Sequence, residues 1–288
     1  MKIYLFGAST ETDNYPTFSD FPWQGWGYRL KDYFDDSVEI INLSLAGWSL
    51  KALTSVSYAP FTELIQQYPE NYKDESKSVW AYLMSKVGNG DYVVMGGTSV
   101  NARFREDMGW QESVEEYKEL LTSCCKKLME KGAKPIIVTD APSMRIYEHI
   151  KKYEEAKFEV CKEFDGKIQV LDIAKEFYSI FETGKYSKDE FITKYFRTKA
   201  TIEHYYSRYG FIGNKLCRYF GNNPENFKVD EVHMCIEGAL TQSSIFVRLA
   251  KENIAGLSDR IVRTKLDMDR CIREDLVSVA DNVSINFE

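Results

Sequence analysis

Long apolar runs are missing from this sequence, and a segment that crosses a bilayer needs about 18 such residues. The opening residues, MKIYLFGAST, hold only a short apolar stretch that runs into a Gly-Ala-Ser turn and not into a signal-peptide cleavage site. This leaves a cytosolic protein, or a mature or recombinant form whose leader was removed; we expect a cytoplasmic protein with no membrane partner.

Paired cysteines and excess basic charge are also missing. The formal net charge of −7 repels phosphate backbones, so we expect no nucleic-acid partner. Free thiols are expected, because no C-x-x-C pair and no zinc-finger histidine spacing occur among the six cysteines, which are Cys124, Cys125, Cys161, Cys217, Cys235 and Cys271.

Short β-branched runs alternate with segments of helical periodicity. The runs are almost wholly apolar, as strands covered on both faces are, so the pattern predicts a three-layer α/β/α sandwich around a five-stranded parallel sheet, as in flavodoxin-like folds. No repeat or linker divides the chain, which predicts one domain over residues 1–288. The predicted strands are Lys2–Phe6, Val38–Leu43, Tyr92–Met95, Pro135–Thr139 and Ile168–Leu171.

The helices follow from amphipathic spacing. A stretch dense in aromatic and basic residues, from Glu176 to Phe227, departs from the alternation and is interpreted as a helical insertion. The predicted helices are Gly27–Phe34, Ser113–Lys131, Tyr147–Glu163, Ile236–Ile254 and a charged one over Asp259–Val279.

Small and hydroxyl residues follow the first three predicted strands, whose carboxyl ends share the edge where open parallel sheets bind ligands. Ser9, directly after the first strand, can present both its hydroxyl and its backbone N–H to one pocket, which suits a nucleophile. Two other interpretations stay open at this point: Ser9 caps a helix, or it lines a phosphate-binding turn.

The chain has only three histidines from which to choose a catalytic base. His149 lies among charged residues, and His204 lies in an aromatic and basic segment. His233 follows Asp230 by three residues, a spacing at which the carboxylate can orient the imidazole and leave its far nitrogen free to accept a proton. Alternatively, Asp230 caps a helix and His233 is incidental.

Five blocks of sequence carry a family resemblance from end to end. They are Gly7-Ala8-Ser9-Thr10, Gly25-Trp26-Gly27, Asn42 to Ser49, Gly90 to Val94 leading into Gly96 to Asn101, and Asp230-Glu231-Val232-His233. Their order and spacing resemble the SGNH (GDSL-like) hydrolase superfamily, and within it the rhamnogalacturonan acetylesterase-like carbohydrate esterases.

The resemblance implies a serine esterase in which Ser9, His233 and Asp230 form the catalytic triad. It implies an oxyanion hole made of the backbone N–H groups of Ser9 and Gly47 and a side chain of the third block, with no cofactor and no metal. The implied partner is a small-molecule or oligosaccharide acyl ester, most simply an O-acetyl carbohydrate. Trp26 and Trp48 lie in these blocks and are candidates for stacking on sugar rings.

Two positions depart from the family pattern. Ala8 stands where an aspartate normally braces the turn, and Val100 stands near the place of the expected asparagine, which leaves Asn101, Thr98 or Ser99 as the third donor. Loss of one oxyanion donor costs about 2–4 kcal/mol of transition-state stabilisation.

Other functions remain open on the sequence. One is a lipid or thioester acyl hydrolase of the same superfamily, and another is a carbohydrate-binding or scaffold protein that has lost turnover. A flavodoxin-like nucleotide binder is a third, although it gives no role to Asp230 and His233. Nine Lys or Arg against four Asp or Glu between Lys185 and Lys228 suit either an acidic sugar or a solvated helix face.

Overall fold

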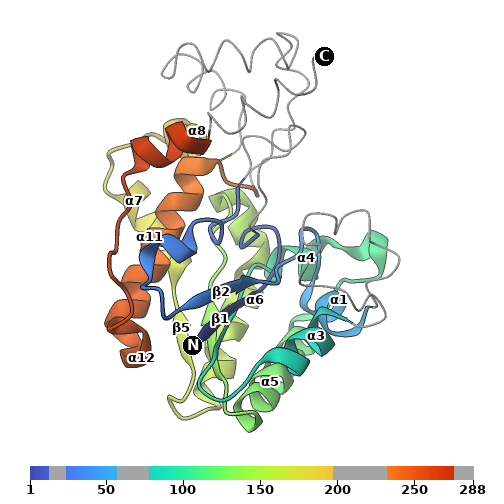
Figure 1. The fold of residues 1–288 in the computed structure, drawn as a ribbon. Coiled ribbons are helices and arrows are strands. Elements are labelled where there is room, and N and C mark those ends of the chain that lie inside the picture. The colour runs from blue at the N-terminus through green and yellow to red at the C-terminus, as the bar shows by residue number, and fades with distance from the viewer. Residues whose placement is uncertain (13–23, 57–77, 197–231, 276–288) are drawn as a thin grey trace, which may run out of the picture.

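A five-stranded parallel sheet lies at the centre of the molecule. The computed structural model describes residues 1–12, 24–56, 78–196 and 232–275 (Figure 1). The strand order is β2-β1-β3-β4-β5. The strands are β1 (Lys2–Phe6), β2 (Glu39–Asn42), β3 (Tyr92–Met95), β4 (Lys134–Val138) and β5 (Gln169–Leu171), which confirms the five predicted strands to within about two residues.

Successive strand residues enter two separate hydrophobic cores. Tyr4 and Phe6 of β1 point into one core, whereas Ile3 and Leu5 point into the other. All four side chains are fully buried, which explains why the strand reads as a continuous apolar run.

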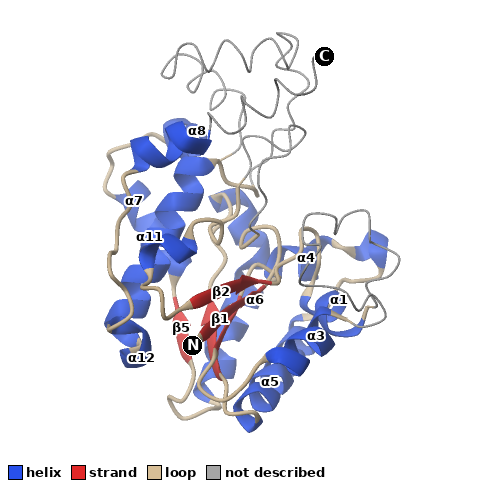
Figure 2. Cartoon of the chain, viewed as in Figure 1, coloured by secondary structure: helices blue, strands red, loops and turns tan. Residues whose placement is uncertain are grey.

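Helices cover both faces of the sheet (Figure 2). The first core lies under α1 (Leu50–Ser55), α3 (Val79–Lys86), α4 (Ser99–Phe104), α5 (Val114–Glu130) and α6 (Met144–Lys162). The second lies under η1 (Leu30–Tyr33), α7 (Ile173–Glu182), α8 (Lys188–Tyr195), α11 (Ile236–Asn253) and α12 (Ala255–Ser258). A 3-10 turn, η3 (Glu106–Met108), follows α4. The predicted α/β/α sandwich is confirmed.

The long helices agree with prediction, and two other segments do not. Of the helix predicted over Gly27–Phe34, only the 3-10 turn η1 forms. In the segment Asp259–Val279, helix is found only over residues 268–275 of the described part. The predicted insertion begins inside α7, at Glu176, and contains the whole of α8. Residues 197–227 lie outside the described residues.

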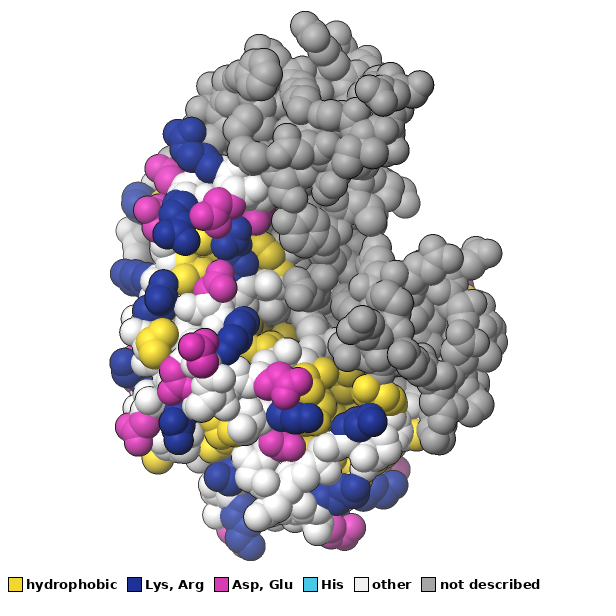
Figure 3. Space-filling view, in the orientation of Figure 1, with side chains coloured by type: hydrophobic (Ala, Val, Ile, Leu, Met, Phe, Trp, Pro, Cys, Tyr) yellow, Lys and Arg dark blue, Asp and Glu magenta, His cyan; other side chains and the backbone are white. Residues whose placement is uncertain are grey.

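The face shown in Figure 3 carries Lys and Arg side chains interspersed with Asp and Glu. On the part of this face that the structure describes, no continuous basic stretch is visible. Over the described ranges, no helix is long and apolar enough to cross a membrane.

Phe177 of α7 is the centre of an aromatic cluster in the second core. Its ring contacts those of Phe191, Tyr195 and Phe196, and its side chain is fully buried. Phe177→Ala should lower the free energy of unfolding by about 3–5 kcal/mol, because the cavity cannot collapse fully. Urea unfolding checks this, with Phe158→Ala on the exposed side of α6 as the matched control. Equal losses in both variants would contradict the central packing role of Phe177.

Candidate active site

The loops after β1, β2 and β3 meet at the carboxyl edge of the sheet. The backbone N–H of Leu45 donates to the carbonyl of Gly7 at 3.0 Å, which ties the second loop to the first. A Cβ on Gly7 would lie 2.6 Å from the carbonyl oxygen of Gly96, so the first and third loops are in backbone contact. The three blocks that the sequence analysis singled out therefore form one surface.

Ser9 lies in a tight turn directly after β1. The backbone N–H of Glu11 donates to the carbonyl of Ala8 at 3.1 Å, and the Thr12 hydroxyl donates to the carbonyl of Ser9 at 2.9 Å. Ser9 is buried, with 5% of its surface exposed. The predicted nucleophile therefore lies in a hydrogen-bonded turn at the carboxyl end of β1.

The Gly25-Trp26-Gly27 block packs against this turn and does not start a helix. The backbone N–H of Trp26 donates to the carbonyl of Thr10 at 2.8 Å. A Cβ on Gly25 would lie 2.2 Å from the carbonyl oxygen of Thr12, and one on Gly27 would lie 2.3 Å from that of Glu11. The two glycines are needed because no side chain fits where these backbones touch.

The segment of His233 joins the same assembly. Met234, the next residue, accepts a hydrogen bond at 3.0 Å from the N–H of Gln24 and forms an isolated antiparallel bridge with Phe196. The Ser243 hydroxyl of α11 donates to the carbonyl of Trp26. Residues 24–26 thus connect the His233 segment to the Ser9 turn, although the two are more than 200 residues apart in the sequence. Asp230, the predicted orienting acid, lies outside the described residues.

The second loop presents Gly47 in a left-handed conformation. Its φ is +79°, and a Cβ there would meet no atom within 4 Å, so the residue faces open space. Asn42, at the end of β2, fixes the base of this loop by donating from Nδ2 to the carbonyl of Glu11 at 2.7 Å and accepting from the Ser44 N–H at 3.0 Å. The predicted oxyanion glycine therefore lies on the loop that adjoins the Ser9 turn.

The third loop directs most of its polar side chains inward. Asn101 donates from Nδ2 to the carbonyl of Trp48 at 3.0 Å, which ties α4 to the second loop. The Thr98 hydroxyl shares a hydrogen bond with the Tyr117 hydroxyl at 3.0 Å, and Ser99 is fully buried. Of the three candidates for the third oxyanion donor, Asn101 is the one that adjoins the second loop.

The two tryptophans expected to stack on sugar are packed inside the protein. Trp26 is 2% exposed and its ring lies 5.0 Å from that of Phe246, centroid to centroid, while Trp48 is 3% exposed and lies 5.1 Å from Trp110. Neither ring presents an open face, so we withdraw both as stacking platforms. Large aromatic side chains fill cores more often than they line sites, because burial of their area is strongly favourable.

A residue that the sequence analysis did not consider lies beneath the Ser9 turn. Glu11 is 1% exposed, and its carboxyl accepts hydrogen bonds from residues on both sides of Ser9. A glutamate between two threonines reads as a solvated turn residue, so nothing in the local pattern indicates its burial.

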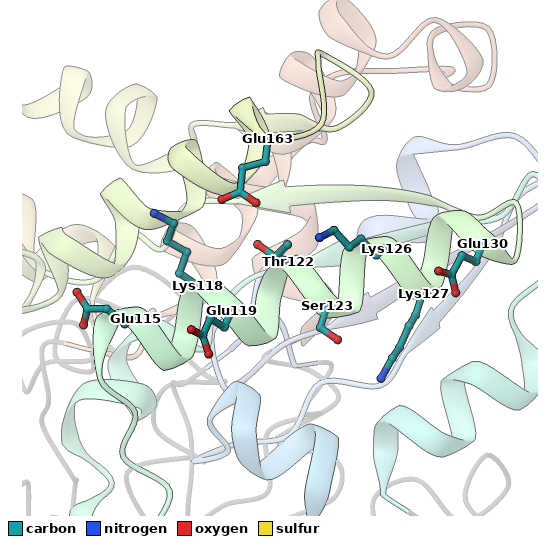
Figure 4. A pocket seen from close by; sticks show the side chains of 9 residues that line it. All are labelled: Glu115, Lys118, Glu119, Thr122, Ser123, Lys126, Lys127, Glu130 and Glu163. Atoms are coloured by element: carbon teal, nitrogen blue, oxygen red, sulfur yellow. The ribbon is translucent and has the colours of Figure 1, made fainter.

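An open depression on the far side of the first core is a weaker candidate (Figure 4). Eight of its lining residues lie along α5, and the ninth is Glu163. Lysines and glutamates share this face, and Lys118 pairs with Glu159 at 2.7 Å, as on an ordinary solvated helix. His149, at an edge of Phe104, is also on an exposed helix face. Within the described ranges, no three His, Cys, Asp or Glu side chains gather as metal ligands.

Comparison with solved structures bears on the fold. Protein YxiM from Bacillus subtilis superposes with a TM-score of 0.60 at 17% sequence identity, over 88% of this chain. The chain therefore shares an α/β fold with YxiM.

Two further matches are more distant. One is a protein from Desulfitobacterium hafniense assigned to the G-D-S-L lipolytic family, at a TM-score of 0.38 and 19% identity over 60% of this chain and 78% of the other. The other is a variant of Axe2, an acetyl-xylooligosaccharide esterase from Geobacillus stearothermophilus. It matches at a TM-score of 0.49 and 12% sequence identity, over 86% of this chain and 93% of the other. This chain spans 57% of the length of YxiM. No protein-family model and no curated protein sequence matches this chain.

Proposed function

We propose that this chain is a serine esterase that hydrolyses O-acyl esters, with Ser9 as nucleophile, His233 as general base and Asp230 as the acid that orients it. One observation carries the proposal: residues 24–26 bind both the carbonyl of Thr10, next to Ser9, and the carbonyl of Met234, next to His233. Residues 24–26 thus link the two segments, which supports the proposal because ligands of open parallel sheets bind where such loops gather.

The oxyanion hole in this proposal uses backbone donors of two loops. Among the described residues, no acceptor is found for the N–H of Ser9 or of Gly47, and both groups belong to loops that the Leu45 to Gly7 hydrogen bond holds together. Asn101 is the third donor, through the amide hydrogen that does not bind Trp48. Fixed donors of this kind stabilise the charge that develops on a carbonyl oxygen.

The reaction then proceeds in two steps. His233 takes the proton of the Ser9 hydroxyl as the oxygen attacks the ester carbonyl, and the tetrahedral oxyanion collapses to an acyl-serine as His233 gives that proton to the leaving alcohol. In the second step His233 takes a proton from water, whose oxygen attacks the acyl-serine. The acid is released and the proton returns to Ser9.

The proposed substrate is an acetyl ester on a carbohydrate. The resemblance of the five motif blocks to carbohydrate esterases supports this choice. The main alternative is a longer acyl group on a lipid or thioester, which requires an apolar channel to hold the chain.

A panel of 4-nitrophenyl esters tests the esterase proposal and separates the acetyl substrate from the longer-acyl alternative. With acetyl, butyryl and octanoyl esters, kcat/KM should be highest for acetyl and fall as the acyl chain lengthens, and acetylated xylo-oligosaccharides should release acetate. Preference for octanoyl would favour the lipid alternative. A folded protein that hydrolyses no ester, and whose Ser9 does not react with a fluorophosphonate, would overturn the esterase proposal in favour of a binding protein.

A further inference from the structure

The carboxyl of Glu11 bonds to the residues on both sides of Ser9. Its Oε2 accepts from the backbone N–H of Ala8 at 3.1 Å and from the Thr10 hydroxyl at 2.9 Å. Its Oε1 accepts from the indole Nε1 of Trp26 at 3.2 Å. One side chain thus fixes the turn before and after the nucleophile and joins it to the Gly25-Trp26-Gly27 block.

Glycines make room for this carboxyl. A Cβ on Gly97, whose φ is +66°, would lie 1.6 Å from Oε2 of Glu11, and one on Gly7 would lie 2.7 Å from the same oxygen. A Cβ on Gly96 would lie 3.1 Å from Oε1. The carboxyl therefore fills the space between the loops after β1 and β3, and a side chain at Gly97 would displace it.

A buried charged cluster lies behind Glu11. Asp140, which follows β4, accepts hydrogen bonds from the N–H groups of Gly97 and of Ser99. Lys157 of α6 lies 3.3 Å from Asp140 and 3.0 Å from Glu154, and all three side chains are buried. The same cluster that faces Glu11 thus also holds the third loop.

The groups that face the Glu11 carboxyl come from every element packed on it. They are the Thr10 hydroxyl, the Trp26 indole, the Asp140 carboxyl and the Lys157 ammonium, with Glu154 behind Lys157. Burial, and then repulsion from Asp140, raise the pKa of Glu11 to about 8, against the hydrogen bonds that lower it. Burial therefore disfavours the charged form of the Glu11 carboxyl.

We propose that Glu11 is a positioning residue of the Ser9 turn, which holds Ala8 and Thr10 so that the Ser9 hydroxyl and N–H face the substrate. It fills the bracing role left open by the alanine at position 8. The inference rests on the proposed esterase function. Whether Glu11 holds Ala8 and Thr10 in place can nevertheless be tested without measuring esterase activity.

Kinetics of two Glu11 variants test the positioning. Glu11→Ala should lower kcat about 10- to 100-fold with little change in KM, because a small misplacement of a nucleophile costs rate and not binding. Glu11→Gln keeps the shape and one acceptor oxygen, so it should recover most of that loss. Leu128→Ala is the control, because it opens a cavity at the far end of α5, away from the motif loops. If Glu11→Ala and Leu128→Ala have the same kcat, Glu11 does not position the turn.

Titration gives a readout that needs no activity. The folded pKa of Glu11 is raised above its unfolded value, so the stabilising contribution is complete below about pH 4.5 and is lost as pH rises through about 8. As pH rises from about 5 to 9, the urea midpoint of the wild type should therefore decrease relative to that of Glu11→Gln. In nitrogen-15 NMR, the Trp26 indole resonance should shift over that range in the wild type and not in Glu11→Gln.

These readouts separate the two proposals. If the wild type hydrolyses esters and Glu11→Ala keeps the kcat of the control, the esterase proposal stands and the positioning role is wrong. If the wild type neither hydrolyses esters nor labels with a fluorophosphonate, the esterase proposal fails. The Trp26 indole resonance then decides whether Glu11 anchors the turn: it should differ between the wild type and Glu11→Ala, and the same resonance in both would overturn that too.

Discussion

Replacing Ser9 with alanine should lower kcat for 4-nitrophenyl acetate by roughly 10⁴- to 10⁶-fold, the range seen when a catalytic serine is removed from a triad. The expected loss is large because alanine has no oxygen to form the acyl intermediate, whereas the backbone donors of the oxyanion hole remain. His233→Ala should cost a similar factor, and the double variant should cost no more than either single one, because the two side chains act as a unit.

Ser85→Ala is the matched control for Ser9→Ala. Ser85 lies on an exposed position of α3, and its hydroxyl bonds only to the carbonyl of Tyr82 in its own helix. Stopped-flow measurement of nitrophenolate release should show wild-type kcat for this control. Retention of wild-type kcat by Ser9→Ala would show that another group is the nucleophile, and the triad assignment would then be abandoned.

Replacing Lys157 with methionine should lower the free energy of unfolding by about 3–5 kcal/mol at pH 7, because it leaves buried carboxyls without their cation. Lys157 is fully buried, and its ammonium contacts Asp140, Glu154 and the carbonyl of Val138. Burial alone would lower the pKa of Lys157, but Asp140 and Glu154 outweigh it and shift the pKa upward. The lysine is therefore charged in the folded protein.

The control for Lys157→Met is Lys118→Met. Lys118 also pairs with a glutamate, but on the exposed surface between α5 and α6, where we expect only a small change in urea unfolding. The deficit of Lys157→Met should shrink as pH is lowered from 8 to 5, because burial raises the pKa of Glu154 to about 7 and this carboxyl becomes protonated over that range. A deficit independent of pH would indicate lost packing and not an unbalanced charge.

The strands were predictable from the sequence because a strand that is buried on both faces appears as a continuous apolar run. Lys2–Phe6 and Tyr92–Met95 agree residue for residue with β1 and β3, since every interior position of a covered strand must be apolar. The helix predicted over Gly27–Phe34 was wrong because its first glycine serves a close approach of two backbones, which periodicity does not report.

The buried charges of the candidate site were not predictable. Glu154 and Lys157 are three residues apart, the spacing of an ordinary exposed ion pair, and only the packing of α6 on the sheet shows that both face inward. The burial of Glu11 was not predictable either, because a local pattern cannot show that glycines at positions 7 and 97 leave space for its carboxyl. The triad assignment from Ser9 and His233 stays a prediction.

The junction at residues 24–26 has a consequence during synthesis. The strand β1 and its turn leave the ribosome before His233 and α11, which follow only after more than 200 further residues. A nascent chain therefore carries the serine long before the partner that would activate it, and α11 must dock before Ser243 can bind Trp26. Under the proposed function, esterase activity during translation would therefore appear only after α11 has docked.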